Sequence, residues 1–295
     1  MFVKDEVRQC VVFIGYRLPS GELSLQGTAF FVFRSVHDNY EQSTQGFTHL
    51  VTAAHVIQGI SSKNDFDGKI LIKASRMDGT VAIFEERIEL WQFHPTESEV
   101  DVAVLPFVSP LQEQTDSKVI PLGMFLSDDV RDEHEIGLGD EVFLPGLFIN
   151  HHGRQRNIPI VRAGNIAAMP EEKVYTSFGI IDAYLVEARS IGGLSGSPVF
   201  VHLGMDRKFE KNSFLVGTGE RTGTNFLLGL MHGHYKVQPA PSQPSPDATL
   251  QEEAINMGIA IVVPSEKILE VLGQPAIRDL ENQLEEEAAA GGRNT

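Results

Sequence analysis

The sequence contains a single cysteine, Cys10, so no disulfide can form within the chain. Disulfide-rich secreted scaffolds are therefore excluded, and the fold needs no oxidising compartment. The chain also lacks any apolar run approaching the roughly 20 residues that span a bilayer. Near its start, Lys4, Asp5, Glu6 and Arg8 interrupt any stretch that could serve as a secretory signal. We expect a cytoplasmic protein that does not contact a membrane.

Positive charge is scarce. Lysine and arginine together number 24 against 40 aspartates and glutamates, which gives a formal net charge of −16. An acidic surface repels phosphate backbones, so we expect no nucleic-acid partner. With 42% hydrophobic residues among 295, the chain can bury one large core or two modest ones.

Helical periodicity is rare, and most apolar segments are short and rich in Val, Ile, Phe and Thr, as β-strands are. The expected strands fall into two successive sets, at 10–18, 27–35, 48–56, 69–77, 81–93 and 101–107, and at 141–149, 159–169, 181–188, 196–203, 226–237 and 257–265. Two sets predict an all-β fold of two packed β units.

We place the first unit at 1–115, the second at 116–273 and an acidic tail at 274–295. The stretch 264–273 is the exception to the β pattern. Its apolar residues have helical spacing, so we expect a C-terminal helix with Ser265 as N-cap.

The sharpest local pattern is the glycine-rich stretch 192–200, which contains Ser195. A nucleophilic serine needs an exposed hydroxyl on a tight turn and backbone N–H groups facing the oxyanion. Glycines at 193 and 196 allow such a backbone. Taken alone, the pattern is also that of an ordinary glycine-rich turn before a strand.

Two further segments supply the partners that a nucleophilic serine needs. A buried strand ends in small residues just before His55, which could act as a general base held at the edge of the core. Asp101 opens an apolar strand, where an acid is costly to bury unless it is paired. Taken singly, each residue could have a purely structural role: His55 as a hydrogen-bonded histidine at a strand end, and Asp101 as the cap of a turn. Together, their order His, Asp, Ser is that of chymotrypsin, with His55 and Asp101 in the first unit and Ser195 in the second.

At these motifs the chain resembles the trypsin-like serine peptidases, in particular the bacterial branches with HtrA-type proteases and glutamyl endopeptidases. The matching segments are Thr52-Ala53-Ala54-His55, Asp101-Val102-Ala103-Val104-Leu105, Gly193-Leu194-Ser195-Gly196-Ser197-Pro198 and Gly27-Thr28-Ala29-Phe30-Phe31-Val32. The resemblance implies two packed antiparallel β-barrels of the chymotrypsin-like kind. It also implies an oxyanion hole made by the N–H groups of Gly193 and Ser195, action on a protein or peptide substrate, and no cofactor.

One departure concerns Leu194, which stands where the family usually has Asp or Asn. An apolar residue cannot pair with a newly freed N-terminus, so a trypsin-style zymogen switch is not expected. The way in which the oxyanion loop is held is then an open question.

In this family the specificity pocket is walled by residues just before the serine and by the strand near 226–235. The corresponding residues here are Arg189, Ser190, Met231, His232 and Gly233. Arg189 or His232 facing the pocket would favour an acidic substrate side chain. If Arg189 faces solvent instead, Met231 leaves a plain apolar pocket.

Histidines at 151, 152, 232 and 234 make zinc ligation conceivable, but their spacing fits no recognised site, and we predict no metal. The leading hypothesis is a serine endopeptidase with the triad His55, Asp101 and Ser195. A catalytically silent homologue that binds a peptide or a partner protein is the alternative. A protease restricted to one partner protein is a third. The oligomeric state is left open.

Overall fold

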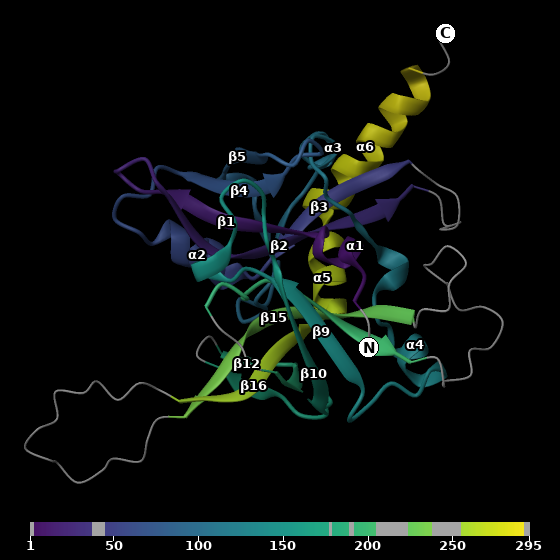
Figure 1. Cartoon of the computed structure of the whole chain (residues 1–295). Helices are drawn as coiled ribbons and strands as arrows, with labels where there is room; N and C mark the ends of the chain where they lie inside the picture. Colours follow the sequence, from purple (N-terminus) through teal and green to yellow (C-terminus); the bar gives the residue numbers. More distant parts are fainter. Residues whose placement is uncertain are drawn as a thin grey trace, which may run out of the picture.

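The structure is a computed structural model that describes residues 3–36, 45–176, 179–188, 192–204, 224–237 and 255–291. Two β units lie one above the other, and helices α5 and α6 run from the second unit along the first (Figure 1). The pocket residues Arg189 and Ser190 lie outside the described residues.

The first half of the chain forms one sheet. Its elements are α1 (Asp5–Arg8), β1 (Val11–Arg17), β2 (Leu23–Ser35), β3 (Gly46–Thr52), α2 (Ala54–Ser61), β4 (Lys69–Ser75), β5 (Val81–Arg87), η1 (Ile88–Leu90), β6 (Gln92–Phe93), β7 (Ala103–Leu105), α3 (Ser109–Glu113), β8 (Ile120–Pro121) and η2 (Leu122–Met124). The strand order is β5-β4-β1-β2-β3-β7-β6, and β8 pairs in parallel with β2. All the other strand pairs in this sheet are antiparallel.

The second half forms a closed six-stranded barrel in the order β10-β13-β16-β15-β14-β9. Its elements are α4 (Asp128–Glu133), β9 (Glu141–Gly146), η3 (Ile149–His151), β10 (Ile160–Ala168), β11 (Val174–Thr176), β12 (Gly179–Ile181), β13 (Tyr184–Glu187), β14 (Pro198–Leu203), β15 (Thr224–Val237), β16 (Ile255–Pro264), α5 (Ser265–Leu272) and α6 (Pro275–Gly291). Strands β11 and β12 pair only with each other.

Alternation along the barrel strands builds two cores at once. In β14, Val199 and Val201 belong to the core inside the barrel, whereas Phe200 between them belongs to the core shared with the first sheet. Strand β9 repeats this pattern, and its Phe143 stacks on Phe200 with ring centroids 5.1 Å apart. Because successive side chains point to opposite faces of a strand, one face closes the barrel and the other docks it on the first sheet.

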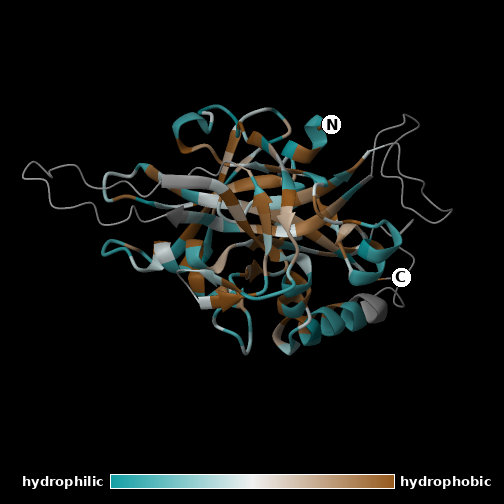
Figure 2. Cartoon of the chain, turned by 90° about the horizontal axis from the view of Figure 1, so that it is seen from below, coloured by the Kyte–Doolittle hydropathy of each residue, from teal (hydrophilic) through white to brown (hydrophobic). Residues whose placement is uncertain are grey.

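Figure 2 shows hydrophobic residues gathered on the strands in the middle of the molecule, with α6 largely hydrophilic. Helix α6 is fastened to the first sheet by its one buried acid, Glu281. That carboxylate lies 3.1 Å from His49 Nε2 and 3.3 Å from an Arg34 amino group. Glu281 and His49 are both fully buried.

The predicted all-β fold with two packed antiparallel units and a C-terminal helix is confirmed. The barrel of the second unit closes, while the hydrogen-bonded ladder of the first ends at β5 and β6. The prediction that Ser265 caps α5 was wrong. Pro264 occupies the N-cap, and the Ser265 hydroxyl donates to the Leu126 carbonyl at 2.9 Å. Within the described ranges, no helix is both long and apolar enough to cross a membrane.

Candidate active site

Asp101 holds His55 at two points. Its Oδ1 accepts the backbone N–H of His55 at 2.8 Å, and its Oδ2 lies 2.7 Å from His55 Nδ1. Because a carboxylate oxygen only accepts, Nδ1 carries the proton, and in the neutral ring the lone pair is then on Nε2. This is the tautomer that a general base needs, because the other ring nitrogen must be able to take a proton.

The local sequence explains why His55 is held so firmly. Strand β3 ends at Thr52, and α2 begins two residues later, so His55 lies in the first helical turn rather than at a strand end. Ala53 and Ala54 are buried, and their small side chains let the helix start against the sheet. The imidazole itself stays 19% exposed, which leaves it an open edge.

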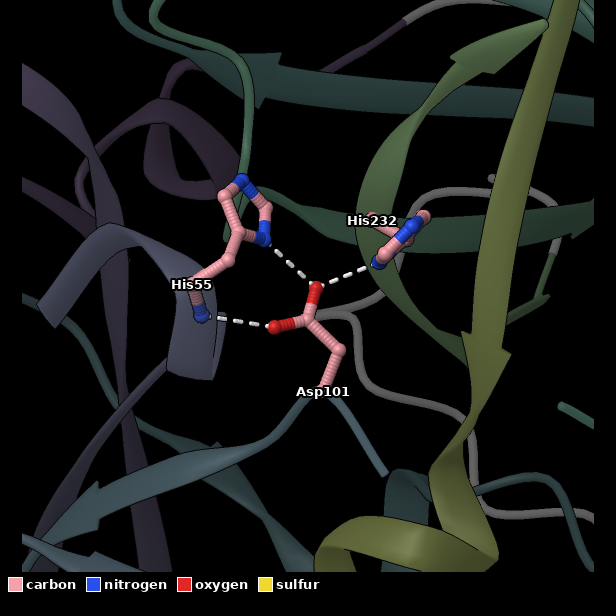
Figure 3. A group of neighbouring side chains, drawn as sticks. All are labelled: His55, Asp101 and His232. Atoms are coloured by element: carbon pink, nitrogen blue, oxygen red, sulfur yellow. Dashed lines mark hydrogen bonds and ion pairs between the residues drawn. The ribbon is translucent and has the colours of Figure 1, made fainter. Parts of the chain in front are cut away.

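A second histidine shares the same carboxylate oxygen. His232, on β15, places its Nδ1 2.5 Å from Asp101 Oδ2. Figure 3 shows the Asp101 carboxylate between the two rings, which come from opposite units of the molecule. The ring centroids of His55 and His232 lie 5.5 Å apart in an edge-on arrangement. Sequence reasoning missed this contact because nothing in the spacing of 55, 101 and 232 signals it.

The acidity of Asp101 reflects these partners. Burial alone would raise the pKa of this carboxyl, but the hydrogen bonds from His232 and His55 outweigh it and keep the pKa below its usual value. Asp101 therefore stays ionised although its side chain is only 3% exposed. A fixed negative charge beside His55 can stabilise the imidazolium that forms when the base takes a proton.

Ser195 lies at the same junction. Among the described residues, its hydroxyl makes one hydrogen bond, which it donates to the backbone carbonyl of His232 at 3.3 Å. The hydroxyl is thus directed at the strand that carries His232, not at His55. Nucleophile–base contacts are commonly long or misaligned before substrate binds, so this geometry is compatible with the predicted triad.

The loop at 192–197, which carries Ser195, is held against the first sheet by Thr28, a fully buried residue of β2. Its hydroxyl donates to the Gly193 carbonyl at 2.8 Å and accepts the Leu147 N–H at 2.9 Å. Its backbone N–H donates to the Ser195 carbonyl at 3.0 Å. Gly196, with φ +82°, packs so closely that a Cβ there would lie 2.2 Å from the Thr28 carbonyl oxygen. Only glycine fits at this position.

Leu194 shows how the loop is held on its other side. Its side chain is fully buried and belongs to the core of the second barrel. An apolar anchor therefore stands at the position where the trypsin-like peptidases that this motif resembles usually have an acidic residue. Within the described residues, no hydrogen bond uses the N–H of Gly193 or of Ser195, so both donors are available to an oxyanion.

The residues expected to wall the specificity pocket differ in their placement. Met231 is fully buried and belongs to the barrel core. His232 is buried and faces Asp101 rather than a substrate side chain. Gly233 faces open space, with nothing within 4 Å of a built Cβ. Because His232 is already paired, it offers no support for an acidic preference, and Arg189 lies outside the described residues.

A cavity of about 400 Å³ lies beside Asp101. Its lining comes from the segment before β7, from the β11–β12 hairpin and from the end of β16 with α5. Charged side chains of both signs line it, Glu97, Glu99 and Asp182 with Lys173 and Lys267. It is large enough for a side chain of an extended polypeptide.

Comparisons with known proteins find similarities among solved structures alone. No protein-family model matches it, and no curated protein matches its sequence. Solved structures do match. Deg5 is 14% identical, with 90% of this chain and 88% of that chain covered and a TM-score of 0.48. The protease domain of MamO from Magnetospirillum magneticum, in its apo form, is 14% identical over 90% and 97%, with a TM-score of 0.47.

A third match is Rv3671c from M. tuberculosis H37Rv, in the inactive form of a Ser343Ala mutant. It is 17% identical over 90% of this chain and 86% of that chain, with a TM-score of 0.45.

Proposed function

We propose that this chain is a serine endopeptidase that hydrolyses peptide bonds of protein or peptide substrates. In this proposal Ser195 is the nucleophile, His55 the general base and acid, and Asp101 the residue that orients His55. The two-point contact between Asp101 and His55 is the observation that carries the proposal. It sets both the tautomer and the direction of the imidazole, and a merely structural carboxylate has no need to do either.

The reaction begins with a rotation of the Ser195 side chain from the His232 carbonyl toward His55. As Oγ attacks the substrate carbonyl carbon, its proton passes to His55 Nε2, and the negative charge on the carbonyl oxygen is met by the N–H groups of Gly193 and Ser195. His55 then gives the proton to the leaving amine, and the acyl-enzyme forms. His55 next takes a proton from a water molecule as that water attacks the ester carbon. It then returns the proton to Ser195 Oγ, which leaves as the carboxylic acid product forms.

Labelling of the full-length protein with a fluorophosphonate probe tests this directly. We expect the wild type to label at Ser195 and Ser195→Ala to lose the label. Asp101→Asn should slow labelling by about 10⁴-fold, because it stabilises the wrong histidine tautomer. Ser197→Ala is the matched control, since Ser197 lies two residues away with its hydroxyl buried, and it should keep the label. A label that persists in Ser195→Ala removes Ser195 from the mechanism.

A catalytically silent peptide-binding homologue is the second candidate. The hydrogen bond from the Ser195 hydroxyl to the His232 carbonyl favours it, because that contact holds the nucleophile away from the base. This candidate predicts that neither wild type nor Ser195→Ala reacts with the probe, while both bind the same peptides with equal affinity. The endopeptidase predicts instead that the wild type cleaves the peptides that Ser195→Ala only binds.

A further inference from the structure

Two imidazoles and one carboxylate converge at a single point between the two units. One ring nitrogen of His55, one of His232 and a carboxylate oxygen of Asp101 lie within 4.8 Å of one another. Both ring nitrogens point at the same oxygen, Oδ2 (Figure 3). A triad requires only the first of these imidazoles. The second makes the group a set of three ligand atoms of the kind found in catalytic zinc sites, where water takes the fourth position.

We propose that His55, Asp101 and His232 form a Zn²⁺ site that switches the peptidase off when it is occupied. Imidazole nitrogen and carboxylate oxygen are ligands that Zn²⁺ accepts readily. The inhibitory part of this inference rests on the proposed function, while the binding part stands on the three side chains alone.

Each nitrogen–oxygen distance needs only a small adjustment, while the two ring nitrogens, within 4.8 Å of each other, must approach to the same spacing. Donors around a tetrahedral Zn²⁺ stand about 3.3 Å apart when the bonds are about 2.0–2.1 Å long. Here the two nitrogen–oxygen separations are 2.7 Å and 2.5 Å, so the donors must spread by less than an ångström. The ion has access from the His55 side, where that side chain is 19% exposed while those of Asp101 and His232 are 3% and 4% exposed. The net charge of −16 raises the local concentration of cations.

Inhibition would follow because the metal coordinates Nδ1 of His55. To coordinate Zn²⁺, Nδ1 of His55 must present a lone pair, so its proton leaves and solvent returns one to Nε2. No net proton is released, but the tautomer is reversed. With a proton already on Nε2, His55 cannot accept the proton of Ser195. The metal therefore blocks general-base catalysis without occupying the substrate cleft.

A second cluster on the described surface provides the internal comparison. His94, Glu97 and Glu270 also bring three potential ligand atoms together. There, Lys267 Nζ lies 3.0 Å from Glu270 and 3.4 Å from Glu97. The ammonium group of Lys267 thus already neutralises the carboxylates that a metal ion would need as ligands. We infer that the ion selects the first cluster.

Equilibrium dialysis of the full chain against Zn²⁺ tests the binding. We expect one Zn²⁺ per chain, and a loss of affinity of at least about tenfold in His232→Asn and in Asp101→Asn, since removing even a partner of a ligand costs that much. Asn at 232 keeps an N–H donor near the position of Nδ1 but offers no imidazole. His94→Asn and His234→Asn, the latter on the same strand as His232, are the matched controls and should bind as the wild type does.

Co²⁺ in place of Zn²⁺ should show visible bands of tetrahedral coordination that His232→Asn loses. Thermal melting confirms that each variant is folded. Three results would overturn the site. The first is an unchanged Zn²⁺ affinity in both His232→Asn and Asp101→Asn, and the second is a loss of binding in His94→Asn alone. The third is tighter binding of Fe²⁺ or Mn²⁺ than of Zn²⁺.

Labelling by the fluorophosphonate probe separates the two proposals. With Zn²⁺ present, wild-type labelling should fall and return when a chelator is added. If the protein labels but binds no Zn²⁺, the metal site fails and the proposed function stands. If it binds Zn²⁺ through these residues but never labels, the proposed function fails and the metal site stands.

Discussion

Thr28, on the first sheet, donates its hydroxyl proton to the carbonyl of Gly193, on the loop of the second unit that carries Ser195, at 2.8 Å. The same oxygen accepts the Leu147 N–H. One side chain thus links the loop that carries Ser195 to both halves of the protein.

Replacing this hydroxyl should weaken both stability and catalysis. Thr28→Val keeps the shape but leaves the Gly193 carbonyl and the Leu147 N–H without a partner. We expect the free energy of unfolding to fall by about 2 kcal/mol and fluorophosphonate labelling to slow by about tenfold or more. Thr115→Val is the control, since the buried Thr115 hydroxyl donates to the Gln112 carbonyl far from the site. It should lose stability without a change in labelling rate. Equal labelling by both variants would contradict the role assigned to Thr28.

Leu194 provides the second prediction. Leu194→Ala removes a buried anchor of the oxyanion loop and should cost about 3 kcal/mol of unfolding free energy, as other buried leucines do. Labelling should slow in parallel, because the Gly193 N–H is no longer held in place. Leu144→Ala, in the same barrel core but outside the loop, serves as the comparison. Urea denaturation and labelling kinetics measure the two effects. If Leu144→Ala slows labelling as much as Leu194→Ala, Leu194 acts only through stability.

From the environment of Lys73 we expect the free energy of unfolding to rise with pH. This lysine of β4 donates to the Gly153 carbonyl at 2.6 Å, and its burial lowers its pKa to about 8. An unfolded chain, with a lysine pKa of about 10.4, binds this proton more tightly than the folded protein does. Between about pH 8 and 10.4 the unfolded state therefore holds more protons, and the unfolding free energy contributed by this group increases with pH.

Urea denaturation at several pH values should show this rise in the wild type and not in Lys73→Met. Lys69→Met is the control on the same strand. The exposed Lys69 has a raised pKa through its hydrogen bond to Glu85, so its contribution declines as pH increases. Parallel pH profiles for the wild type and Lys73→Met would show that Lys73 is not the source.

Glu281 supports the docking of α6. Burial raises the pKa of this carboxyl, but its interactions with His49 and the charge of Arg34 outweigh that effect and hold the pKa below its usual value. Its lowered pKa stabilises the fold above the unfolded value of about 4.3, and this contribution is lost as the pH falls through the folded value. Glu281→Gln should therefore cost about 3 kcal/mol at neutral pH, and much less in acid.

The exposed Glu286 lies on the same helix, and Glu286→Gln should change stability by no more than about 0.5 kcal/mol. Thermal melts at pH 7 and below pH 4 measure both variants. Equal losses for Glu281→Gln at the two pH values would mean that packing, not charge, is what the mutation removes.

Sequence patterns were sufficient for the fold class, because strand periodicity and turn residues are local. They also brought His55 and Asp101 together, since each lies beside a recognisable strand. They could not find the contact between His232 and Asp101, because it depends on how β15 docks against the segment before β7. A pairing between residues that far apart in sequence leaves no local signal.

The placement of the expected pocket residues was harder to predict from the sequence for the same reason. Met231 and His232 follow the usual alternation of a strand, so the first side chain enters the barrel core and the next meets Asp101. A bulge then shifts the register of β15 between Met231 and Gly233, and no local pattern in the sequence shows where that shift falls. The buried hydroxyl of Thr28 was equally invisible, because a threonine in a strand is usually read as a β-former.

The ion pair between Arg34 and Glu281 joins residues 247 positions apart. During synthesis on the ribosome, strands β2 and β3 are made long before the carboxylate that neutralises the interior of their sheet. A nascent chain that stops short of α6 must therefore hold His49 and Arg34 without that acid, which disfavours closure of the sheet around them. We therefore expect the first half of this protein to complete its folding only after translation has delivered the helix that follows the second half.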